Sequence, residues 1–234
     1  MDTKNSFMEK YLTPIAVLIG AVILAVAYVY GHGATTTTGT PPTGASVADI
    51  TQVKTEGEPY IGDANAPVAM ALYFDYQCPF CKQFDQVVIP KLSDAIKNGQ
   101  LKVYLKDFQF LGEDSQTAAE FGRAMWDLYP DKYYDWVVAM FNAQDDEGDQ
   151  GFGDLTSIVA MTKAQVSGVD TDKVVATMNE KKAEYDAAIL ADRNEGASMG
   201  VNGTPSVVMG NQLFYAMTPD QFYSAITNEL QAEL

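Results

Sequence analysis

The sequence predicts an α/β fold with a helical subdomain inserted into it, preceded by an N-terminal transmembrane helix. Three observations lead to this prediction. A buried apolar strand at 68–74 is followed at once by a helix with one apolar face. Residues 113–200 are mainly helical in their periodicity, and strands return only after them. Residues 11–31 form one uncharged, largely apolar run near the start of the chain.

The run at 11–31 has the length of a membrane span, because its 21 uncharged residues reach roughly 31 Å as a helix. Lys4 and Lys10 precede it, and the next basic residue is Lys54. The positive-inside rule therefore places the N-terminus in the cytoplasm and the rest of the chain outside. A cleaved signal peptide is the competing interpretation, but the small-residue triplet at 25–27 lies inside the apolar run. We expect an uncleaved, single-pass anchor in the cell membrane.

A Thr-, Gly- and Pro-rich segment follows the anchor and predicts a disordered, semi-extended linker. The formal net charge of -16 lies wholly on the domain after it, because the four charges before Asp49 cancel. An acidic surface argues against nucleic acid and against anionic lipid head groups as partners. The expected organisation is a cytoplasmic N-terminus at 1–10, an anchor at 11–31, a linker at 32–48, and a domain at 49–234 with a helical insert at about 113–200.

Cys78 and Cys81 are the only cysteines in the chain, and they form a C-x-x-C motif between the strand at 68–74 and the next helix. Cys78 falls at the helix N-cap and Pro79 at the first helical position, where a missing N–H costs nothing. Free backbone N–H groups and the helix dipole at this end stabilise a thiolate, so the pKa of Cys78 should be lowered. Cys81, one turn deeper, can then attack a mixed disulfide formed at Cys78.

Other interpretations of the pair are weaker. A structural zinc site needs four ligands, and the one histidine, His32, lies in the linker. A structural disulfide across two intervening residues would remove little entropy from the unfolded chain. The acidic stretch at 145–154 does not match a calcium-binding loop, because Gln150 and Thr156 stand where glycine and glutamate are needed. We therefore expect no metal and no cofactor.

Periodicity and turn residues predict the other elements. In chain order these are strands at 60–61 and 68–74, a helix at 79–98 kinked at Pro90, a strand at 101–106, helices at 115–129, 133–141, 155–168 and 171–199, strands at 206–209 and 212–215, and a final helix opened by a capping box at 218–221.

The stretches 75–84 (DYQCPFCKQF) and 201–208 (VNGTPSVV), with the helical insert between them, resemble the DsbA-like thioredoxin-fold oxidoreductases. The resemblance covers about Tyr60 to the C-terminus. It implies that the Thr204–Pro205 bond is cis, although cis X-Pro bonds are uncommon in general. It also implies that this loop lies against Cys78 and Cys81, with the Thr204 backbone pairing with an extended substrate segment. Pro205, which lacks an N–H, would leave that edge free.

Two positions depart from the best-known member of that family. Phe80 occupies the second position between the cysteines in place of histidine, so the thiolate loses a nearby donor and positive charge. We therefore expect the pKa of Cys78 to be lowered less than in a C-P-H-C enzyme. Leu72 stands where many thioredoxin-fold enzymes have a buried acid, six residues before the first cysteine. Asp75 or Lys106 could move the Cys81 proton instead.

The resemblance implies an extracytoplasmic thiol–disulfide oxidoreductase, acting as a monomer, that forms disulfides in cysteine-containing exported proteins by exchange at Cys78 and Cys81. The substrate-binding residues would be Thr204 and Pro205, with Pro79 and Phe80 in support. A disulfide donor must be reoxidised, which implies a quinone-linked membrane redox partner. The alternatives are a reductase or isomerase of exported thiols, or a peptide-binding or chaperone module without redox turnover.

Overall fold

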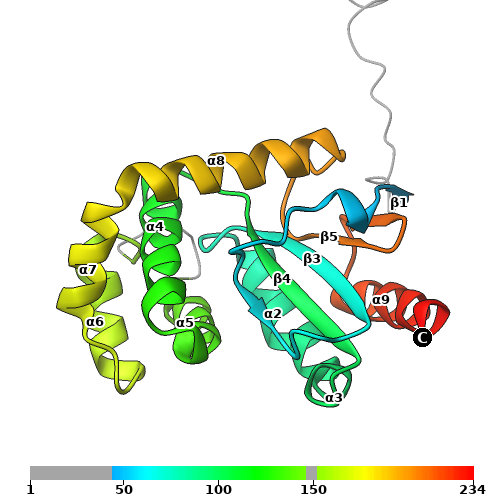
Figure 1. The fold of residues 1–234 in the computed structure, drawn as a ribbon, viewed down its shortest axis with the longest axis horizontal. Coiled ribbons are helices and arrows are strands. Elements are labelled where there is room, and N and C mark those ends of the chain that lie inside the picture. Colours follow the sequence, from blue (N-terminus) through cyan, green and yellow to red (C-terminus); the bar gives the residue numbers. More distant parts are fainter. Residues whose placement is uncertain (1–43, 146–151) are drawn as a thin grey trace, which may run out of the picture. The chain divides into compact units, whose positions relative to one another are not determined.

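A six-stranded sheet organises the computed structural model, which describes residues 44–145 and 152–234 (Figure 1). The strand order is β1-β6-β5-β3-β4-β2. Within this sheet β3 and β4 pair in parallel, and the other neighbours pair antiparallel. The strands are β1 (Gly44–Val47), β2 (Tyr60–Ile61), β3 (Val68–Phe74), β4 (Leu101–Asp107), β5 (Ser206–Met209) and β6 (Gln212–Tyr215).

The helices fall into those that cover the sheet and those that form the insert between β4 and β5. The covering helices α2 and α9 pack on each other behind the sheet in the view of Figure 1. The helices outside the insert are η1 (Ile50–Gln52), α2 (Pro79–Lys91), α3 (Ser93–Lys97) and α9 (Pro219–Glu233). The insert consists of α4 (Glu113–Leu128), α5 (Pro130–Ala143), α6 (Leu155–Gln165), α7 (Thr171–Glu180) and α8 (Lys182–Ser198).

Alternation along β3 gives the sheet two apolar faces, because successive side chains of a strand point to opposite sides. Met70, Leu72 and Phe74 belong to the larger core, which contains the buried side chains of α2 and α9. Ala71 and Tyr73 belong to a second, smaller core on the other face. Burying an apolar side chain of this size contributes about 1.5–3 kcal/mol, so the sheet is anchored on both sides.

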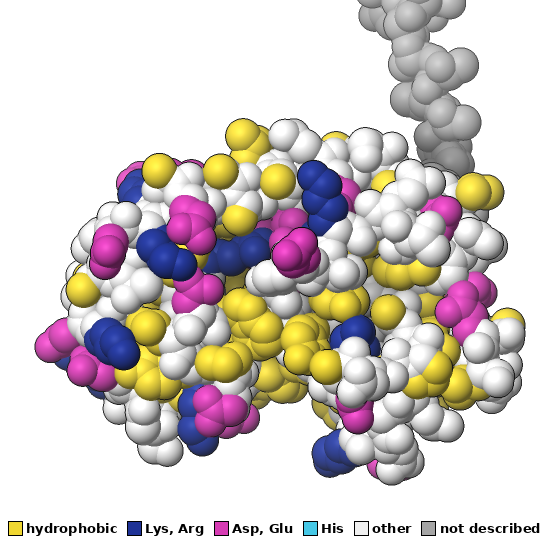
Figure 2. Space-filling view, viewed as in Figure 1, with side chains coloured by type: hydrophobic (Ala, Val, Ile, Leu, Met, Phe, Trp, Pro, Cys, Tyr) yellow, Lys and Arg dark blue, Asp and Glu magenta, His cyan; other side chains and the backbone are white. Residues whose placement is uncertain are grey.

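The insert packs around Trp136, which is fully buried on α5. Its ring contacts Phe121 of α4, Tyr133 of α5 and Tyr76 from the loop after β3. This aromatic cluster joins the insert to the segment that leads into α2. Figure 2 shows apolar side chains gathered in a hollow between the lobe of insert helices and the sheet.

The expected strands at 60–61, 206–209 and 212–215 are confirmed, as is the capping box between Thr218 and Gln221. The expectation of a linker through residue 48 is wrong at its end. Residues 44–47 form β1 and pair with β6, because β6 offers an open edge that an extended chain can join.

Two long helices are shorter than expected. The helix predicted at 79–98 ends at Lys91, and α3 begins at Ser93. Pro90 cannot donate the hydrogen bond back to Gln86, and it weakens the helix at this place. The helix predicted at 171–199 is divided at Lys181 into α7 and α8.

The expected anchor at 11–31 and most of the acidic stretch at 145–154 lie outside the described residues. Among the residues that are described, no helix combines the length and apolarity needed to cross a membrane. The same part of the chain contains no cluster of three or more His, Cys, Asp or Glu side chains arranged for a metal ion.

Candidate active site

The sheet brings the two sequence motifs together. Strand β5 runs antiparallel to β3, with Ser206 opposite Tyr73, so the residues before Ser206 lie beside those after β3. Thr204 and Cys78 are 126 positions apart in the sequence, and the Cys78 thiol Sγ donates to the Thr204 carbonyl oxygen at 3.4 Å. The Thr204–Pro205 peptide bond is cis. The structure therefore places Thr204 and Pro205 beside the C-x-x-C motif.

Cys78 occupies the N-cap of α2, with extended backbone angles (φ -80°, ψ 118°) and Pro79 at the start of the helix. A hydrogen bond from the Cys81 thiol is the largest influence on Cys78 and lowers its pKa to about 6, with further lowering from the Thr204 hydroxyl and the backbone N–H groups of Phe80 and Cys81. Burial opposes this lowering. Cys78 is therefore poised to be a thiolate near neutral pH.

Cys81 has the opposite character. Burial raises the pKa of its thiol well above the ordinary value, and the neighbouring Cys78 sulfur raises it further. Both cysteines are free thiols in this structure. The pair is therefore asymmetric, with Cys78 as the nucleophile and Cys81 as a thiol that must lose its proton before it can attack.

Asp75 organises the loop that leads to Cys78. Its carboxylate accepts hydrogen bonds from the backbone N–H groups of Gln77, Phe110 and Leu111 at 2.8, 3.0 and 3.2 Å. It also accepts one from the Ser115 hydroxyl at 2.6 Å. With four donors already on its two oxygens, Asp75 is a positioning residue rather than a free proton acceptor.

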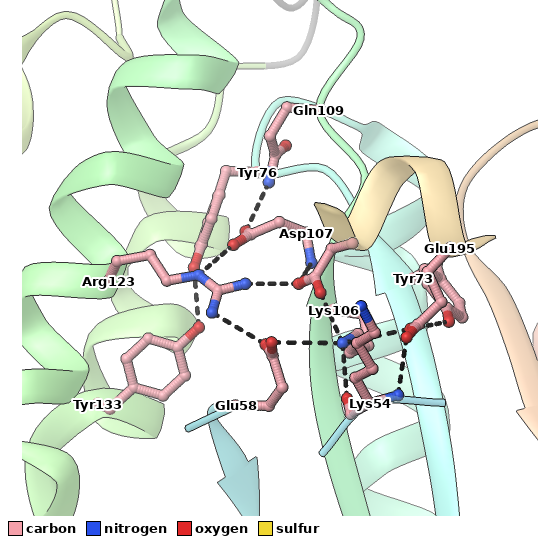
Figure 3. A network of polar contacts seen from close by, with 11 residues as sticks. Lys54, Glu58, Tyr73, Tyr76, Lys106, Asp107, Gln109, Arg123, Tyr133 and Glu195 are labelled. Carbon is pink, nitrogen blue, oxygen red and sulfur yellow. Dashed lines mark hydrogen bonds and ion pairs between the residues drawn. The ribbon is translucent and has the colours of Figure 1, made fainter. Parts of the chain in front are cut away.

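Lys106 is also engaged elsewhere. Its ammonium group is fully buried and pairs with carboxylates of Glu58, Asp192 and Glu195 (Figure 3). Two of these partners lie on α8, and Glu195 also accepts a hydrogen bond from Tyr73, which belongs to the second core. Cys81 belongs to the other, larger core. Of the two groups considered for moving the Cys81 proton, neither is therefore suitably placed.

Sequence reasoning missed Asp85, a buried carboxylate on α2. Its exposed fraction is 7%, and it accepts a hydrogen bond from the Tyr134 hydroxyl at 2.8 Å. Burial raises the pKa of Asp85 to about 6, against a lowering influence of Tyr134. A signal was present in the sequence, because Asp85 follows Cys81 by four positions and so interrupts the apolar face of an expected helix.

Gln144, at the end of α5, was missed as well. Its side-chain amide donates to the Tyr76 backbone carbonyl at 2.9 Å, and its backbone carbonyl accepts from the Lys82 ammonium at 2.8 Å. These bonds fasten both sides of the C-x-x-C motif to the insert. No sequence pattern indicated this role, because the contact joins segments more than sixty positions apart.

The surface near the motif carries exposed aromatic and aliphatic side chains. Phe80 is 66% exposed, and Phe110 and Leu111, which are bonded to Asp75, are 45% and 41% exposed. Most large apolar residues of the described chain are buried, so these three are exceptions. Together they expose apolar surface around the loop that Asp75 organises.

This fold and this site define a thiol–disulfide oxidoreductase: a thioredoxin-type sheet, an inserted helical subdomain, and an asymmetric dithiol at a helix N-terminus. The family model described as thioredoxin matches residues 54–228, and the chain belongs to that family. Within it, the protein is a DsbA-like enzyme of dithiol–disulfide exchange.

Relatives support this placement. Disulfide bond formation protein D of Bacillus subtilis is 25% identical over 189 residues, which cover 78% of this chain and 81% of the relative. A probable disulfide bond formation protein D of Bacillus anthracis is 23% identical over 154 residues, covering 65% and 70%.

Solved structures share the fold. The oxidised BdbD of Bacillus subtilis has a TM-score of 0.69 at 23% identity and covers 80% of this chain and 98% of its own. The thiol-disulfide exchange protein alpha-DsbA2 of Wolbachia pipientis has a TM-score of 0.63 at 25% identity, with 76% and 89% covered. The DsbA of Chlamydia trachomatis has a TM-score of 0.64 at 18% identity, with 76% and 93% covered.

Proposed function

We propose that this protein is a membrane-anchored enzyme that donates disulfide bonds to exported proteins. The observation that carries the proposal is the position of Cys78 at the N-cap of α2, against Thr204, where its surroundings lower the pKa of the thiol to about 6. A stabilised thiolate favours the reduced form of the pair and so makes the disulfide form a stronger oxidant. The relatives named disulfide bond formation protein agree with this direction of electron flow.

The proposed reaction begins with the oxidised pair. A substrate thiolate attacks the Cys78 sulfur, the Cys78–Cys81 bond breaks, and Cys81 leaves with the electron pair and takes up a proton. A second substrate thiolate then attacks the substrate sulfur of the mixed disulfide and releases Cys78 as a thiolate. The substrate dithiol loses two electrons, and the pair gains them. The low pKa of Cys78 makes it a good leaving group in the second step.

Substrate binding would use the edge at Thr204 and Pro205 together with the exposed side chain of Phe80. An extended peptide could pair with the Thr204 backbone as an added strand, which places a substrate cysteine next to Cys78. Such a mode depends little on the sequence of the substrate. It fits a monomeric enzyme acting on many unfolded, cysteine-containing proteins.

The catalytic domain would lie outside the cytoplasm. The anchor at 11–31 would hold the catalytic domain on the extracytoplasmic side of the membrane, where disulfides persist. The same anchor would keep the domain close to a membrane redox partner of the quinone-linked type, which would reoxidise the dithiol by exchange. The apolar run and the basic residues before it support this arrangement.

The reduction potential of the pair tests the direction of electron flow. We expect the full-length protein, equilibrated with glutathione buffers, to have a potential between the roughly -120 mV of the strongest disulfide donors and the roughly -270 mV of thioredoxin, because the pKa of Cys78 is lowered less than in a C-P-H-C enzyme. A value near the roughly -270 mV of thioredoxin would instead make the enzyme a reductase. Absence of a reversible couple would contradict the enzyme function and favour a peptide-binding role.

Single cysteine variants test the assignment of roles. Cys78→Ser should abolish oxidation of a reduced, unfolded substrate. Cys81→Ala should accumulate mixed disulfides with substrates, because the resolving thiol is absent. A chaperone without redox turnover would instead keep its peptide binding in both variants and form no covalent complex.

A further inference from the structure

A small cavity lies beside Cys81. Its volume is about 10 Å³, comparable to the space that one water molecule requires. Cys81, Asp85 and Tyr134 line it together, and the remaining walls are apolar. Those walls are Leu72, Phe74, Phe84, Ile89, Leu105, Val137, Phe141 and Pro205.

Asp85 is the carboxylate of this cavity. It follows Cys81 by four positions on α2, so the two side chains project from the same face of the helix, one turn apart. Its hydrogen-bond partner in the described chain is the Tyr134 hydroxyl, and none of the ion pairs found there includes it. Asp85 therefore retains oxygen lone pairs that no described protein donor occupies.

Asp85 also borders open solvent. Together with Ile89 and Tyr134 it lines a second space, an open groove of about 440 Å³ between α2, α3, α5 and β2. The charged residue of α3 on this groove is Lys97, and β2 contributes the apolar Ile61. Asp85 thus lines both the buried cavity beside Cys81 and a groove that water can fill.

We propose that Asp85 carries the proton of Cys81 between the buried cavity and the groove. The inference rests on disulfide exchange at the cysteine pair and adds the route by which the buried thiol is deprotonated. Asp85 follows Cys81 by one helical turn and lines the same cavity, which brings a carboxylate-bearing side chain next to the buried thiol.

The proton moves in each half of the catalytic cycle. During reoxidation, Cys78 is joined to a sulfur of the partner's disulfide. Cys81 gives its proton to Asp85 and attacks the Cys78 sulfur, the bond to the partner breaks, and the partner sulfur leaves with the electron pair. Asp85 then releases the proton to the groove. When a substrate thiolate opens the Cys78–Cys81 bond, Asp85 returns a proton to Cys81.

The surroundings of Asp85 suit this role. The titratable and charged groups that face it are Cys81 on α2, Tyr134 on α5 and, across the groove, Lys97 on α3. Strands β3 and β4 present only apolar Leu72 and Leu105 to the cavity. Burial raises the pKa of the carboxyl to about 6, so it can gain and lose a proton close to neutral pH.

Decay of a mixed disulfide measures the step directly. Reduced full-length protein is mixed with excess glutathione disulfide, quenched with acid at successive times, and weighed by mass spectrometry. In Asp85→Asn we expect resolution of the Cys78–glutathione adduct to slow about 100-fold near neutral pH, with formation of the adduct unchanged. The variant should approach the wild-type rate at high pH, where Cys81 ionises without help.

Matched variants separate proton transfer from a structural role. Asp94→Asn, an exposed carboxylate on α3, should leave resolution unchanged. Tyr134→Phe keeps the carboxylate but removes a donor that lowers its pKa, so the inflection of the wild-type rate profile near pH 6 should move to higher pH. Because this second variant keeps the acid, it tests the proposal even where Asp85→Asn fails to fold.

An unchanged resolution rate and pH profile in folded Asp85→Asn would overturn the inference while leaving exchange at Cys78 intact. An unshifted inflection in Tyr134→Phe would overturn it as well. If the wild-type protein formed no adduct with glutathione at all, exchange itself would fail, and the inference would fail with it.

Discussion

The ionisation of Cys78 depends on groups from two distant parts of the chain. The thiol of Cys81 and the first backbone N–H groups of α2 are local, whereas the Thr204 hydroxyl comes from the loop before β5. Phe80 supplies a backbone donor but no side-chain donor. The pKa of Cys78 is nevertheless lowered, because the Cys81 thiol provides a side-chain hydrogen bond that Phe80 lacks, and the Thr204 side chain adds a smaller lowering influence.

A titration of the thiolate tests this account of Cys78. The ultraviolet absorbance of the reduced protein should show an ionisation with a midpoint near pH 6. Thr204→Val removes one lowering influence and should move the midpoint to higher pH, while Thr227→Val on α9 should leave it unchanged. A wild-type midpoint at or above the free value of about 8.5 would contradict the activation of Cys78.

The same shift has a consequence for stability. The pKa of Cys78 is lower in the folded protein than in the unfolded chain, so its contribution stabilises the reduced form above pH 6 and is lost as the pH falls through that value. Reduction of the disulfide takes up two protons below pH 6 but only one above it, so between pH 5 and pH 7 it should become less favourable by a smaller amount than reduction of an ordinary disulfide such as that of glutathione.

At the scale of elements, the sequence predicts those helices and strands whose position is set by local apolar periodicity and by turn or capping residues. Strand β3, the start of α2 at Pro79 and the capping box at Thr218 follow from local patterns. The strand at 44–47 does not, because its short run of small residues is extended only where β6 offers an edge. Asp85 shows the same limit: its helical position can be read from the sequence, but the cavity shared with Cys81 is a product of packing.

The contact between α4 and the loop before Cys78 depends on Gly122. A Cβ at this position would lie 2.6 Å from the Tyr76 hydroxyl oxygen and 3.0 Å from the Trp136 ring. The Tyr76 hydroxyl in turn pairs with the Tyr133 hydroxyl at 2.9 Å, inside the aromatic cluster of the insert. Because Gly122 has no side chain, the active-site loop can pack closely against the insert.

Gly122→Ala should destabilise the protein, although alanine is the better helix former. The added methyl group overpacks the site, at a cost of about 1–3 kcal/mol, which exceeds the gain in helix propensity of up to about 1 kcal/mol. Thr117→Ala on the same helix serves as the control and should be neutral or slightly stabilising. Urea unfolding of both variants measures the difference. Equal or greater stability of Gly122→Ala would show that Tyr76 can move aside without cost.

At the scale of the whole molecule, a buried network of charges joins the sheet to the insert (Figure 3). Arg123 of α4 pairs with Glu58 before β2, Asp107 at the end of β4 and Asp192 of α8 at 2.9, 2.7 and 2.5 Å. Lys106 of β4 pairs with Asp192 as well. Burial raises the pKa of Asp192 to about 7, and the two cations oppose this rise.

Removing Arg123 should therefore affect stability far more than removing an exposed cation. Arg123→Met leaves three buried carboxylates without this partner, and breaking a buried pair costs about 3–5 kcal/mol. Lys163→Met on α6 breaks an exposed pair with Asp172, at 3.4 Å, and should change the free energy of unfolding by less than about 1 kcal/mol. Urea unfolding of the two variants gives the comparison.

The pH dependence of the destabilisation caused by Arg123→Met distinguishes an electrostatic cause from a loss of packing. Without Arg123, the pKa of Asp192 in the folded protein should rise further above its value in the unfolded chain, because the arginine lowers it. The folded variant then holds a proton that the unfolded chain releases, so its stability falls as the pH rises toward and past 7. The destabilisation by Arg123→Met should thus be smaller at pH 5 than at pH 8. A loss independent of pH would mean that the arginine acts through its packing and not through its charge.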